Sequence, residues 1–370
     1  MKIIAFYLPQ FHSIPENDEW WGEGFTEWTN VKKGKKYFKW QKQPRVPLDN
    51  NYYCLLDEKT QEWQAKIAED HGIYGFCYYH YWFDGHLLLE KPMENMLRNK
   101  NIKLPFCICW ANEDWTNAWV SSNAKTLISQ TYGDKDEWKR HYDYLKQFFC
   151  DERYIKVDGK LLFVIYRPEI INCLSEMLEL WNDLAIKDGF GGIKFAHQGC
   201  GLDFPVKQDD SIFDYDIEMQ PLYGKNALQT ENKAKRIGRI KAFLQKIKMG
   251  WVHTLFRHSI GPRVFDYSEV WSAIIGQPPI SNKSIPCAFV DFDNTPRRHR
   301  QGWLFKGCNL DAFKKYMSLY LKKTKEQYNT DLMFIFAWNE WGEGGYLEPD
   351  TDNGYGYLDI IKDLNTNNDY

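Results

Sequence analysis

The sequence lacks a long apolar run and has little net charge. Its 370 residues carry a formal charge of -3 at pH 7, so the overall charge gives no indication of nucleic acid binding, and none is expected. No stretch is long enough to span a bilayer. The apolar residues 3–8 are also too short for the core of a secretion signal, and they run directly into Pro9. We therefore expect a cytoplasmic protein.

The cysteines lack the pairing and spacing of a zinc site or a disulfide framework. There are nine of them, and Cys107 and Cys109 are separated by one residue without a second pair. Several, such as Cys77 and Cys287, lie in apolar runs, where a thiol acts as a small hydrophobe. We predict reduced cysteines, in keeping with an intracellular protein.

Several common catalytic signatures are also missing. No Gly-x-Gly-x-x-Gly follows the first predicted strand, and no phosphate loop, Gly-x-Ser-x-Gly or His-Glu-x-x-His is present. These absences remove the usual markers of dinucleotide enzymes, nucleotide hydrolases, serine hydrolases and zinc proteases. We expect no cofactor and no bound metal.

Aromatic residues, in contrast, are abundant. The chain has 16 Trp, 23 Tyr and 23 Phe, and many of them adjoin Asn, Glu or Gly where apolar runs end. A core does not need aromatic side chains in such polar surroundings. Clefts lined by aromatic rings and a few polar groups are typical of small-molecule and carbohydrate sites.

Short apolar runs alternate with helical patterns along the chain. Eight runs read as strands: Ile3–Pro9, Gly72–Trp82, Pro105–Trp110, Leu161–Tyr166, Gly192–His197, Phe213–Gln220, Pro286–Asp291 and Leu332–Trp338. Helices are expected over Thr60–His71, Lys91–Lys100, Asp134–Cys150, Ile171–Asp188, Asn232–His258, Leu310–Tyr328 and Tyr357–Leu364. Alternation of this kind predicts an α/β fold with a parallel sheet, and eight units favour a single (β/α)8 TIM barrel over residues 1–370.

In such a barrel the carboxyl ends of the strands meet at one face, where sites form. The polar and aromatic residues at those ends are therefore the predicted substrate-binding residues: Tyr7, Tyr79, His80, Trp82, Trp110, Asn112, Glu113, Trp115, Arg167, Gln198, Asp291, Asp293, Trp338, Asn339, Trp341 and Tyr346. The first and last strands are neighbours in a closed barrel, so we expect Tyr7 and Glu340 to lie close together.

The first connection, residues 10–56, is unusually long for this architecture. Long loops are commonly lids or binding loops. This one contains Glu27 and Trp28 among further aromatics and glycines, and we expect it to cover the cleft as a lid. The alternative is a loop that packs over the top of the barrel through its own aromatic residues.

The segment 332–350 predicts the catalytic residues. A buried strand, Leu332–Trp338, leads directly into Asn339, Glu340, Trp341 and Glu343. Two carboxylates beside one bond are the basic requirement for glycoside cleavage, with one as acid and the other as base or nucleophile. The alternative is a plain strand end followed by a polar turn.

Asp291-Phe-Asp293 has the Asp-x-Asp pattern that holds a divalent metal in nucleotide-sugar transferases. The pattern is weak alone, because a hard cation needs several converging oxygens. We favour hydrogen bonds to sugar hydroxyls for both residues. His80 and His197 are expected to be hydrogen-bonded residues at strand ends more often than bases or ligands.

The segment 232–265 has nine Lys or Arg and no acidic residue. Ile237, Ile240, Leu244, Ile247 and Trp251 recur at helical spacing, which favours the sixth barrel helix with a solvated basic face. The alternative is an interfacial helix that contacts anionic lipid or a lipid-linked glycan, which would place the protein at the inner face of the membrane.

Five motifs carry a family resemblance over most of the chain. They are Phe6-Tyr-Leu-Pro-Gln-Phe-His12, Trp20-Trp-Gly-Glu-Gly-Phe-Thr-Glu-Trp-Thr-Asn30, Phe76-Cys-Tyr-Tyr-His-Tyr-Trp82, Pro105-Phe-Cys-Ile-Cys-Trp-Ala-Asn-Glu-Asp-Trp-Thr116 and Trp338-Asn-Glu-Trp-Gly-Glu-Gly344. With these the chain resembles the WbsX-type family of bacterial polysaccharide-biosynthesis proteins, described as glycosyltransferases with a domain like glycoside hydrolase family 99.

Family 99 enzymes are endo-acting α-mannosidases and mannanases with a (β/α)8 barrel and an Asn-Glu-Trp-His-Glu-Gly motif at the last strand. Residues 339–344 are similar, with Gly342 in place of His. The resemblance implies that Glu340 is the base that removes the sugar 2-OH proton, giving a 1,2-anhydro sugar. It implies that Glu343 is the acid that protonates the leaving oxygen and then activates water.

Three functions follow as hypotheses. The first is a retaining, metal-independent glycoside hydrolase-like enzyme that acts on an oligo- or polysaccharide of surface-polysaccharide metabolism. The second is a glycosyltransferase in the biosynthesis of O-antigen (lipopolysaccharide) or capsule, which needs a site for a nucleotide- or lipid-phosphate donor. The third is a carbohydrate-binding barrel without catalysis.

Overall fold

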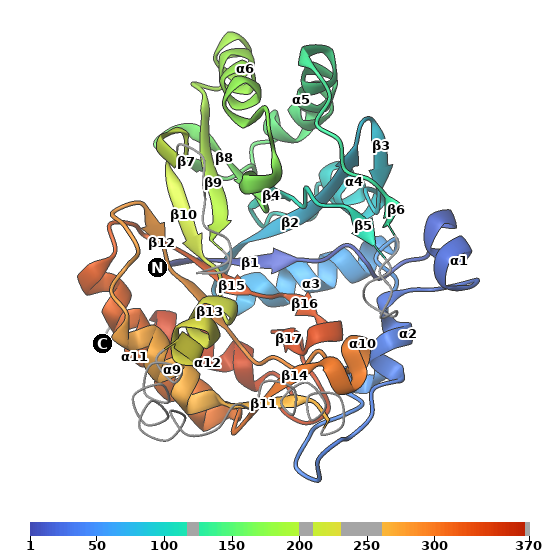
Figure 1. Cartoon of the computed structure of the whole chain (residues 1–370), viewed down its shortest axis with the longest axis vertical. Coiled ribbons are helices and arrows are strands. Elements are labelled where there is room, and N and C mark those ends of the chain that lie inside the picture. Colours follow the sequence, from blue (N-terminus) through green and yellow to red (C-terminus); the bar gives the residue numbers. More distant parts are fainter. Residues whose placement is uncertain (117–125, 200–209, 231–260, 367–370) are drawn as a thin grey trace, which may run out of the picture.

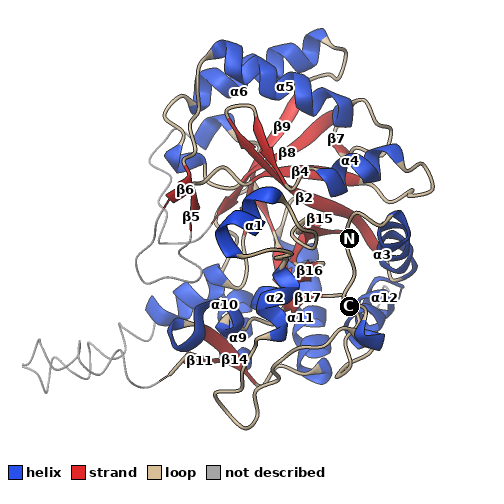
Figure 2. Ribbon diagram, turned by 90° about the vertical axis from the view of Figure 1, so that its right-hand side faces the viewer, coloured by secondary structure: helices blue, strands red, loops and turns tan. Residues whose placement is uncertain are grey.

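Parallel strands surrounded by helices form the body of the molecule (Figures 1 and 2). The computed structural model describes residues 1–116, 126–199, 210–230 and 261–366. Its main sheet has 11 strands, in the order β12-β10-β9-β8-β4-β2-β1-β15-β13 with β3 and β7 at its sides. All eight predicted strands are present, as β1 Lys2–Tyr7, β2 Ile73–Phe83, β4 Phe106–Trp110, β8 Lys160–Ile165, β9 Ile193–Gly199, β10 Tyr215–Glu218, β13 Cys287–Phe289 and β15 Leu332–Phe336. The α/β barrel prediction is confirmed.

The strands are apolar because both of their faces are covered. The five residues of β15 are all buried, and so are those of β4. A parallel sheet with helices outside and a packed centre inside requires such continuous apolar strands. The first and last of the predicted strands pair in parallel, with Ala5 opposite Ile335, as expected for neighbours in a barrel.

One split strand completes the ring. β12, Ser284–Ile285, pairs with β10, whereas β13 pairs with β15 on the other side. Only Pro286 separates the two halves. Proline has no N–H to donate to a ladder, which explains the break, but its carbonyl accepts a hydrogen bond from the Phe334 N–H at 2.9 Å.

The covering helices largely follow the sequence pattern. They include α3 Glu58–Asp70, α4 Lys91–Arg98, α5 Lys135–Phe149, α6 Leu174–Lys187, α11 Leu310–Gln327 and α12 Gly356–Thr366. Side chains placed before the first turn cap three of them. Asp57, Asp134 and Asn309 accept hydrogen bonds from backbone N–H groups of the first turn of α3, α5 and α11.

The sixth unit differs from the sequence pattern. The helix expected at Asn232–His258 lies outside the described residues. The structure has α9, Tyr267–Gly276, between β10 and β12, a helix that was not predicted from the sequence. It packs against α11, where the buried Lys323 ammonium donates to the carbonyl of Ile274 at 2.8 Å. A cation there is also favourable for the carboxyl end of α9.

Short strands lie at the periphery of the barrel. β11 Arg263–Asp266 pairs with β14 Trp303–Lys306, and β16 Asn339–Glu340 pairs with β17 Gly345–Tyr346. Three further antiparallel pairs are β3 His86–Leu88 with β2, β7 Lys156–Val157 with β8, and β5 Trp115–Thr116 with β6 Thr126–Ile128.

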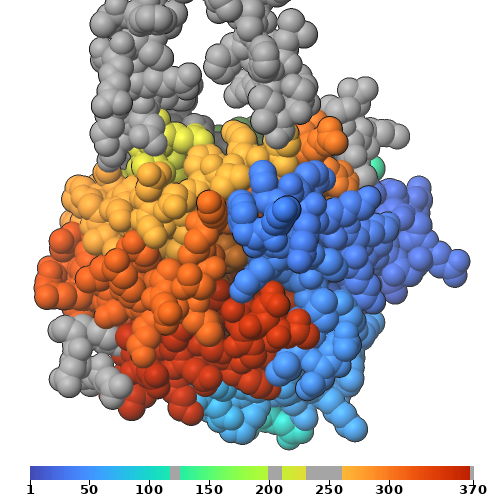
Figure 3. Space-filling view, turned by 90° about the horizontal axis from the view of Figure 1, so that it is seen from below, coloured from blue at the N-terminus to red at the C-terminus, as the bar shows by residue number. Residues whose placement is uncertain are grey.

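The long connection after β1 is folded and packed rather than extended. It contains α1 Pro15–Trp21, α2 Glu27–Lys32 and a 3₁₀ turn at Leu48–Asn50. Backbone hydrogen bonds tie it to the C-terminal loop, from Leu48 N–H to the Pro349 carbonyl and from Thr351 N–H to the Val46 carbonyl. In Figure 3 this blue segment lies against the orange and red C-terminal part of the chain.

Across the described ranges, none of the helices combines the length and the apolar character that crossing a membrane requires. Of the basic segment 232–265, residues 232–260 lie outside these ranges. The membrane contact considered for that segment therefore stays a prediction.

Candidate active site

A cleft of about 780 Å³ opens where the barrel strands end. Residues at or just after the ends of β1, β2, β4, β8 and β15 contribute to its wall, which is the face where such barrels carry their sites. The lining residues are Leu8, Gln10, Asn17, Trp21, Phe25, Glu27, Asn30, Tyr79, Tyr81, Leu89, Ala111, Glu113, Asp114, Trp115, Thr116, Gln130, Tyr132, Tyr166, Ile170, Arg297, Arg298, Phe336, Glu340 and Glu343. Of the predicted site residues, Glu27, Tyr79, Glu113, Trp115, Glu340 and Glu343 are in this wall.

One guanidinium group lies among three carboxylates in this cleft. Arg297 Nη2 is 2.9 Å from Glu340 Oε1, and Arg297 Nη1 is 3.4 Å from Glu343 Oε1. Arg297 Nε donates to Glu27 Oε1 at 2.8 Å. The Arg297 side chain is only 6% exposed, so these charges interact with little screening by water.

The two catalytic candidates belong to one tight turn. After β16, residues Trp341–Glu343 form a 3₁₀ turn, and the Glu343 N–H donates to Glu340 Oε1 at 3.2 Å. Gly344 ends the turn with φ of 69°, a left-handed conformation that favours glycine. The Glu343 carbonyl then accepts from the Asp293 N–H at 2.7 Å, which joins the turn to the segment before Arg297.

Burial raises the pKa of both carboxyl groups. The pKa of Glu340 rises to about 8, because burial and the nearby Glu343 and Glu27 outweigh the opposing effect of Arg297. The pKa of Glu343 is also raised by burial, against the lowering effect of Arg297. The pair therefore retains a proton at neutral pH, so it can supply one acid and one base.

Arg297 is held in place through Asp293. Asp293 Oδ1 accepts from the N–H and the hydroxyl of Thr295, the first residue of α10 Thr295–Arg298. Its Oδ2 accepts from the side-chain amides of Gln41 at 2.8 Å and Gln43 at 3.0 Å. The long loop after β1 thus fixes the start of the short helix that carries Arg297.

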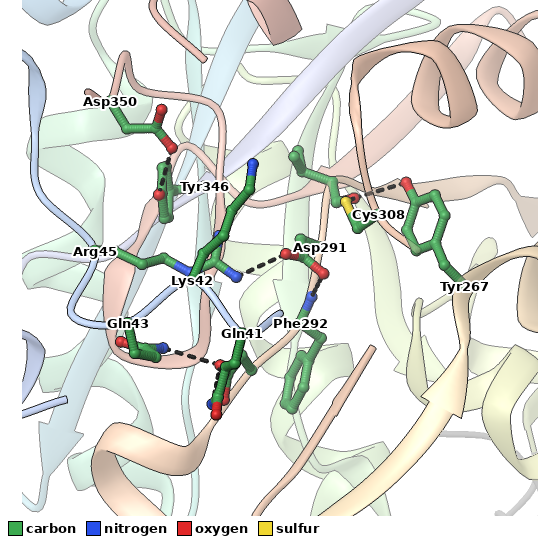
Figure 4. A network of polar contacts seen from close by, with 12 residues as sticks. Gln41, Lys42, Gln43, Arg45, Tyr267, Asp291, Phe292, Cys308, Tyr346 and Asp350 are labelled. Carbon is green, nitrogen blue, oxygen red and sulfur yellow. Dashed lines mark hydrogen bonds and ion pairs between the residues drawn. The ribbon is translucent and has the colours of Figure 1, made fainter. Parts of the chain in front are cut away.

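Asp291 has a comparable partner. Figure 4 shows Arg45, also from the long loop, reaching Asp291, with 2.6 Å between Nη2 and Oδ2. The other Asp291 oxygen accepts from the Phe292 N–H. Neither Asp291 nor Asp293 lines the cleft, so the favoured role of hydrogen bonding to sugar hydroxyls is replaced by anchoring the loop to the barrel.

A buried carboxylate supports the turn that carries Glu340 and Glu343. Glu348 accepts hydrogen bonds from Trp341 Nε1 at 2.6 Å, the Tyr53 hydroxyl at 2.7 Å and Gln64 Nε2 at 2.6 Å. Burial raises the pKa of Glu348 to about 7, although these donors favour its charged form. Sequence reasoning did not single out Glu348.

The two faces of β2 have different neighbours. Tyr79 and Tyr81 line the cleft, and their hydroxyls accept from Gln198 and Gln10, both at 3.1 Å. His80 and Trp82 alternate with them and point to the helix layer, where His80 Nε2 lies 2.9 Å from His141 Nε2 of α5. Alternation of side chains along a strand explains why the predicted His80 and Trp82 lie outside the cleft, and why Tyr81 belongs in it.

Three further predicted residues also lie outside the cleft. The Tyr7 hydroxyl donates to Gln64 Oε1 of α3 at 2.7 Å, so its ring faces the helices although its backbone adjoins the last strand. Trp110 packs on Trp181 of α6, and Trp338 packs on Phe76. All three side chains are buried in the core.

Asn112, Arg167 and Gln198 lie behind the cleft wall. Arg167 Nη1 is 3.1 Å from Glu113 Oε2, and its backbone N–H donates to Asn112 Oδ1 at 2.8 Å. They orient wall residues, as Gln198 orients Tyr79.

The remaining predicted residues also support the structure. Trp341 stacks on Tyr346 with 3.7 Å between ring centroids, and both rings are buried. Trp28 donates its ring N–H to the Tyr53 carbonyl at 2.8 Å. Asn339 joins the segment after β15 to the segment after β1, because its side-chain amide accepts a hydrogen bond from the Leu8 N–H and donates one to the Leu8 carbonyl.

Arg297 is the residue of the cleft, in contact with both catalytic candidates, that the sequence did not indicate. The available signal was the pair Arg297-Arg298, which begins four positions after Asp293 of the Asp-x-Asp that follows the seventh strand. Its role depends on Glu27, 270 positions away in sequence, and no local pattern records that contact.

Within the described part of the chain, no three His, Cys, Asp or Glu side chains are grouped so that they could hold a metal ion.

The model of the family described as Glycosyltransferase WbsX matches residues 3–361. The uncharacterized protein WxcX of Xanthomonas campestris pv. campestris strain B100 is 31% identical over 362 residues, which are 97% of this chain and 49% of that protein. WxcX of strain ATCC 33913 is 30% identical over the same shares of both chains. The chain thus spans about half the length of these relatives.

Solved structures share the fold. A glycoside hydrolase-like protein has a TM-score of 0.59 at 12% identity, covering 98% of this chain and 93% of that one. The GH99 endo-alpha-mannosidase from Bacteroides thetaiotaomicron has a TM-score of 0.54 at 11% identity, covering 98% and 96%. At such identities the likeness shows a common fold only.

Proposed function

The chain belongs to the WbsX glycosyltransferase family, and from that premise we propose that it is a carbohydrate-active enzyme that cleaves a glycosidic bond in a surface polysaccharide or its precursor. The observation that carries the proposal is the placement of Glu340 and Glu343 on one turn in the cleft, both against Arg297. Two carboxyl groups with raised pKa values that share a proton are suited to combined acid and base catalysis.

The proposed reaction has two steps. In the first, Glu340 takes the proton of the sugar 2-OH, and O2 attacks the anomeric carbon to form a 1,2-anhydro sugar. Glu343 gives its proton to the glycosidic oxygen as that bond breaks. In the second, Glu343 removes a proton from water that attacks the anomeric carbon, and Glu340 returns its proton to O2. Two displacements retain the anomeric configuration.

The raised pKa of Glu340 makes it a stronger base but also restricts the pH range in which the pair is correctly protonated. A sugar hydroxyl is a weak acid, so a carboxylate with a pKa of about 8 is a better base for it than an ordinary one. The same value means that free enzyme below that pH holds the proton on the pair. The reaction needs this one proton on Glu343 and an ionised Glu340, so activity is expected to fall as the pH rises above about 8 and the pair loses the proton.

The wall of the cleft is suited to neutral sugars. Tyr79, Tyr81 and Trp115 offer ring faces and hydroxyls near the carboxylates. Among the described lining residues, the carboxylates Glu27, Glu113, Asp114, Glu340 and Glu343 oppose the guanidinium groups of Arg297 and Arg298. An excess of negative charge disfavours an anionic ligand such as a nucleoside diphosphate.

The family description supports a second candidate, a glycosyltransferase of O-antigen or capsule synthesis. Arg298 at the edge of the cleft is the described feature that favours it, because a cation could face a donor phosphate. The third candidate, a binding barrel without catalysis, is disfavoured by the paired carboxyl groups.

A crystal soak separates these candidates. The probes are a panel of short α-linked mannosides, a cyclitol epoxide that mimics the 1,2-anhydro sugar, and nucleotide sugars with Mn²⁺. We expect a sugar ring with O2 near Glu340 and the glycosidic oxygen near Glu343. A nucleoside diphosphate bound in the cleft would instead establish the transferase, and sugar binding without turnover would establish the binding barrel.

The cytoplasmic location and the peripheral membrane contact through residues 232–265 stay predictions. Cell fractionation tests the first. Flotation with anionic and neutral vesicles tests the second, and equal binding to both would contradict an electrostatic contact.

A further inference from the structure

The residue between the two catalytic candidates has no room for a side chain. A Cβ atom added to Gly342 would lie 2.2 Å from Glu27 Oε1 and 2.6 Å from Arg297 Nε. Both distances are far below van der Waals contact. The backbone of Gly342 is not in the left-handed region that calls for glycine, so space alone excludes a side chain.

That space is occupied by the ion pair of Glu27 and Arg297, which come from two short helices far apart in sequence, α2 and α10. Glu27 is the first residue of α2, and its N–H donates to the carbonyl of Gln10, three residues after the end of β1. Arg297 comes from α10, whose start is fixed by Asp293. The pair thus fills the space that a side chain at position 342 would need.

The contacts fix the direction of the guanidinium group. Glu27 takes the Nε donor at 2.8 Å, which leaves the two terminal nitrogens toward Glu340 and Glu343. A guanidinium group is planar, so anchoring Nε sets the plane in which both terminal groups lie. A lysine in the same place could not hold two carboxylates in a defined plane.

We propose that Arg297, anchored by Glu27 in the space left by Gly342, is the positioning residue that sets the relative orientation and the shared protonation of Glu340 and Glu343. The inference rests on the proposed function only where it calls Glu340 a base and Glu343 an acid. Its geometric and electrostatic content concerns the free protein and needs no substrate.

The electrostatic part has a definite sign. Arg297 lowers the pKa of both carboxyl groups, against the effect of burial. Without its charge, three buried carboxylates would face one another, and like charges in low dielectric disfavour ionisation. The pair would then hold its protons to higher pH.

Infrared difference titration of the free protein tests this directly. The carboxylic acid C=O band assigned to the pair, by its loss in Glu340→Gln and Glu343→Gln, is followed against pH in wild type, Arg297→Gln and Arg297→Lys. We expect the band to persist about one pH unit or more higher in Arg297→Gln, and less than that in Arg297→Lys, which keeps the charge. An unchanged midpoint in Arg297→Gln would overturn the proposal.

A second pair of variants probes the space. Gly342→Ala is expected to displace Arg297 and to raise the same midpoint, whereas Gly276→Ala, with nothing within 4 Å of its new Cβ, is expected to leave it unchanged. Circular dichroism confirms folding, and a crystal structure of Gly342→Ala shows the position of Arg297. A Gly342→Ala protein with the wild-type midpoint and Arg297 in place would also overturn the proposal.

The two failures can be told apart. If no glycan is cleaved but the midpoints shift as expected, the proposed function fails and the role of Arg297 stands. If glycans are cleaved and the midpoints do not shift, only the role of Arg297 fails. Where activity is found, the acid limb of its pH profile is expected to move up in Arg297→Gln, a change that lost stability alone does not produce.

Discussion

Tyr81 and Trp82 are consecutive residues of β2 that contact opposite layers of the barrel. The Tyr81 hydroxyl accepts from Gln10 at 3.1 Å in the wall of the cleft. Trp82 instead stacks on His141 of α5 with 4.5 Å between ring centroids, and its ring N–H donates a hydrogen bond to Glu137 Oε1. Replacing the two residues should therefore have separable effects on binding and stability.

The first prediction concerns these two rings. Tyr81→Leu should weaken glycan binding about tenfold, because it removes a ring face and a hydroxyl from the cleft. Trp82→Phe should leave affinity unchanged and lower the free energy of unfolding by about 1–3 kcal/mol, because it deletes a buried hydrogen bond and part of a stack. Titration calorimetry and urea denaturation measure the two effects. The reverse pattern would contradict the assignment of the two faces.

The second prediction concerns the catalytic pair. Glu340→Gln and Glu343→Gln keep the shape of each side chain but remove its ability to exchange a proton. Each should lower kcat by about 10²–10⁴-fold, the usual contribution of a positioned acid or base. Glu326→Gln, at an exposed position of α11, is the matched control and should have wild-type activity. Wild-type turnover in either cleft variant would exclude that residue from catalysis.

The third prediction concerns the pH dependence of stability. Glu340 has a pKa of about 8 in the folded protein and an ordinary value of about 4.3 when unfolded, so between these values the folded state binds more protons. The free energy of unfolding should therefore fall as pH rises through this window. In Glu340→Gln this fall should be smaller. Urea denaturation at several pH values from 5 to 9 compares the slopes, and equal slopes would show that the Glu340 pKa is ordinary.

The fourth prediction concerns the support of the turn. Glu348→Ala should destabilise the protein by about 3 kcal/mol, because Trp341 Nε1 and the Tyr53 hydroxyl would lose a buried acceptor. It should also reduce activity, since Trp341 belongs to the turn that carries both catalytic candidates. Glu326→Ala serves as the exposed control. A loss below about 1 kcal/mol would mean that water replaces the carboxylate.

The fifth prediction concerns Asp293. Asp293→Ala should lower stability by about 2–3 kcal/mol and also lower activity, because Gln41, Gln43 and Thr295 lose their acceptor and the start of α10 is released. The Mn²⁺ dependence of wild-type turnover separates this role from a catalytic metal site. We expect that EDTA and added Mn²⁺ leave the rate unchanged. Activity that requires Mn²⁺ and is lost in Asp293→Ala would support the transferase instead.

Much of the architecture was predictable because it is encoded locally. Buried parallel strands are continuous apolar runs, so all eight were visible in the sequence, and the polar strand ends followed from them. The turn with Glu340 and Glu343 was found in the same way. The split at Pro286 was not foreseen, since its two halves pair with different neighbours.

The direction of side chains at the strand ends was less accessible. His80, Trp82 and Trp110 have the chemistry of a sugar site, yet they face the helices. Only the register of each strand decides between the two faces, and a shift of one residue reverses the assignment. The contact of Arg297 with Glu27 joins segments far apart in sequence, so it required the structure.

The pairing of β1 with β15 also has a consequence for biosynthesis. One edge of β1 pairs with β2, which is near it in sequence, whereas its other edge stays open until residues 332–336 are made and paired. An exposed apolar strand edge invites pairing with other chains. A chain that stops short of residue 332 is therefore expected to be prone to aggregation.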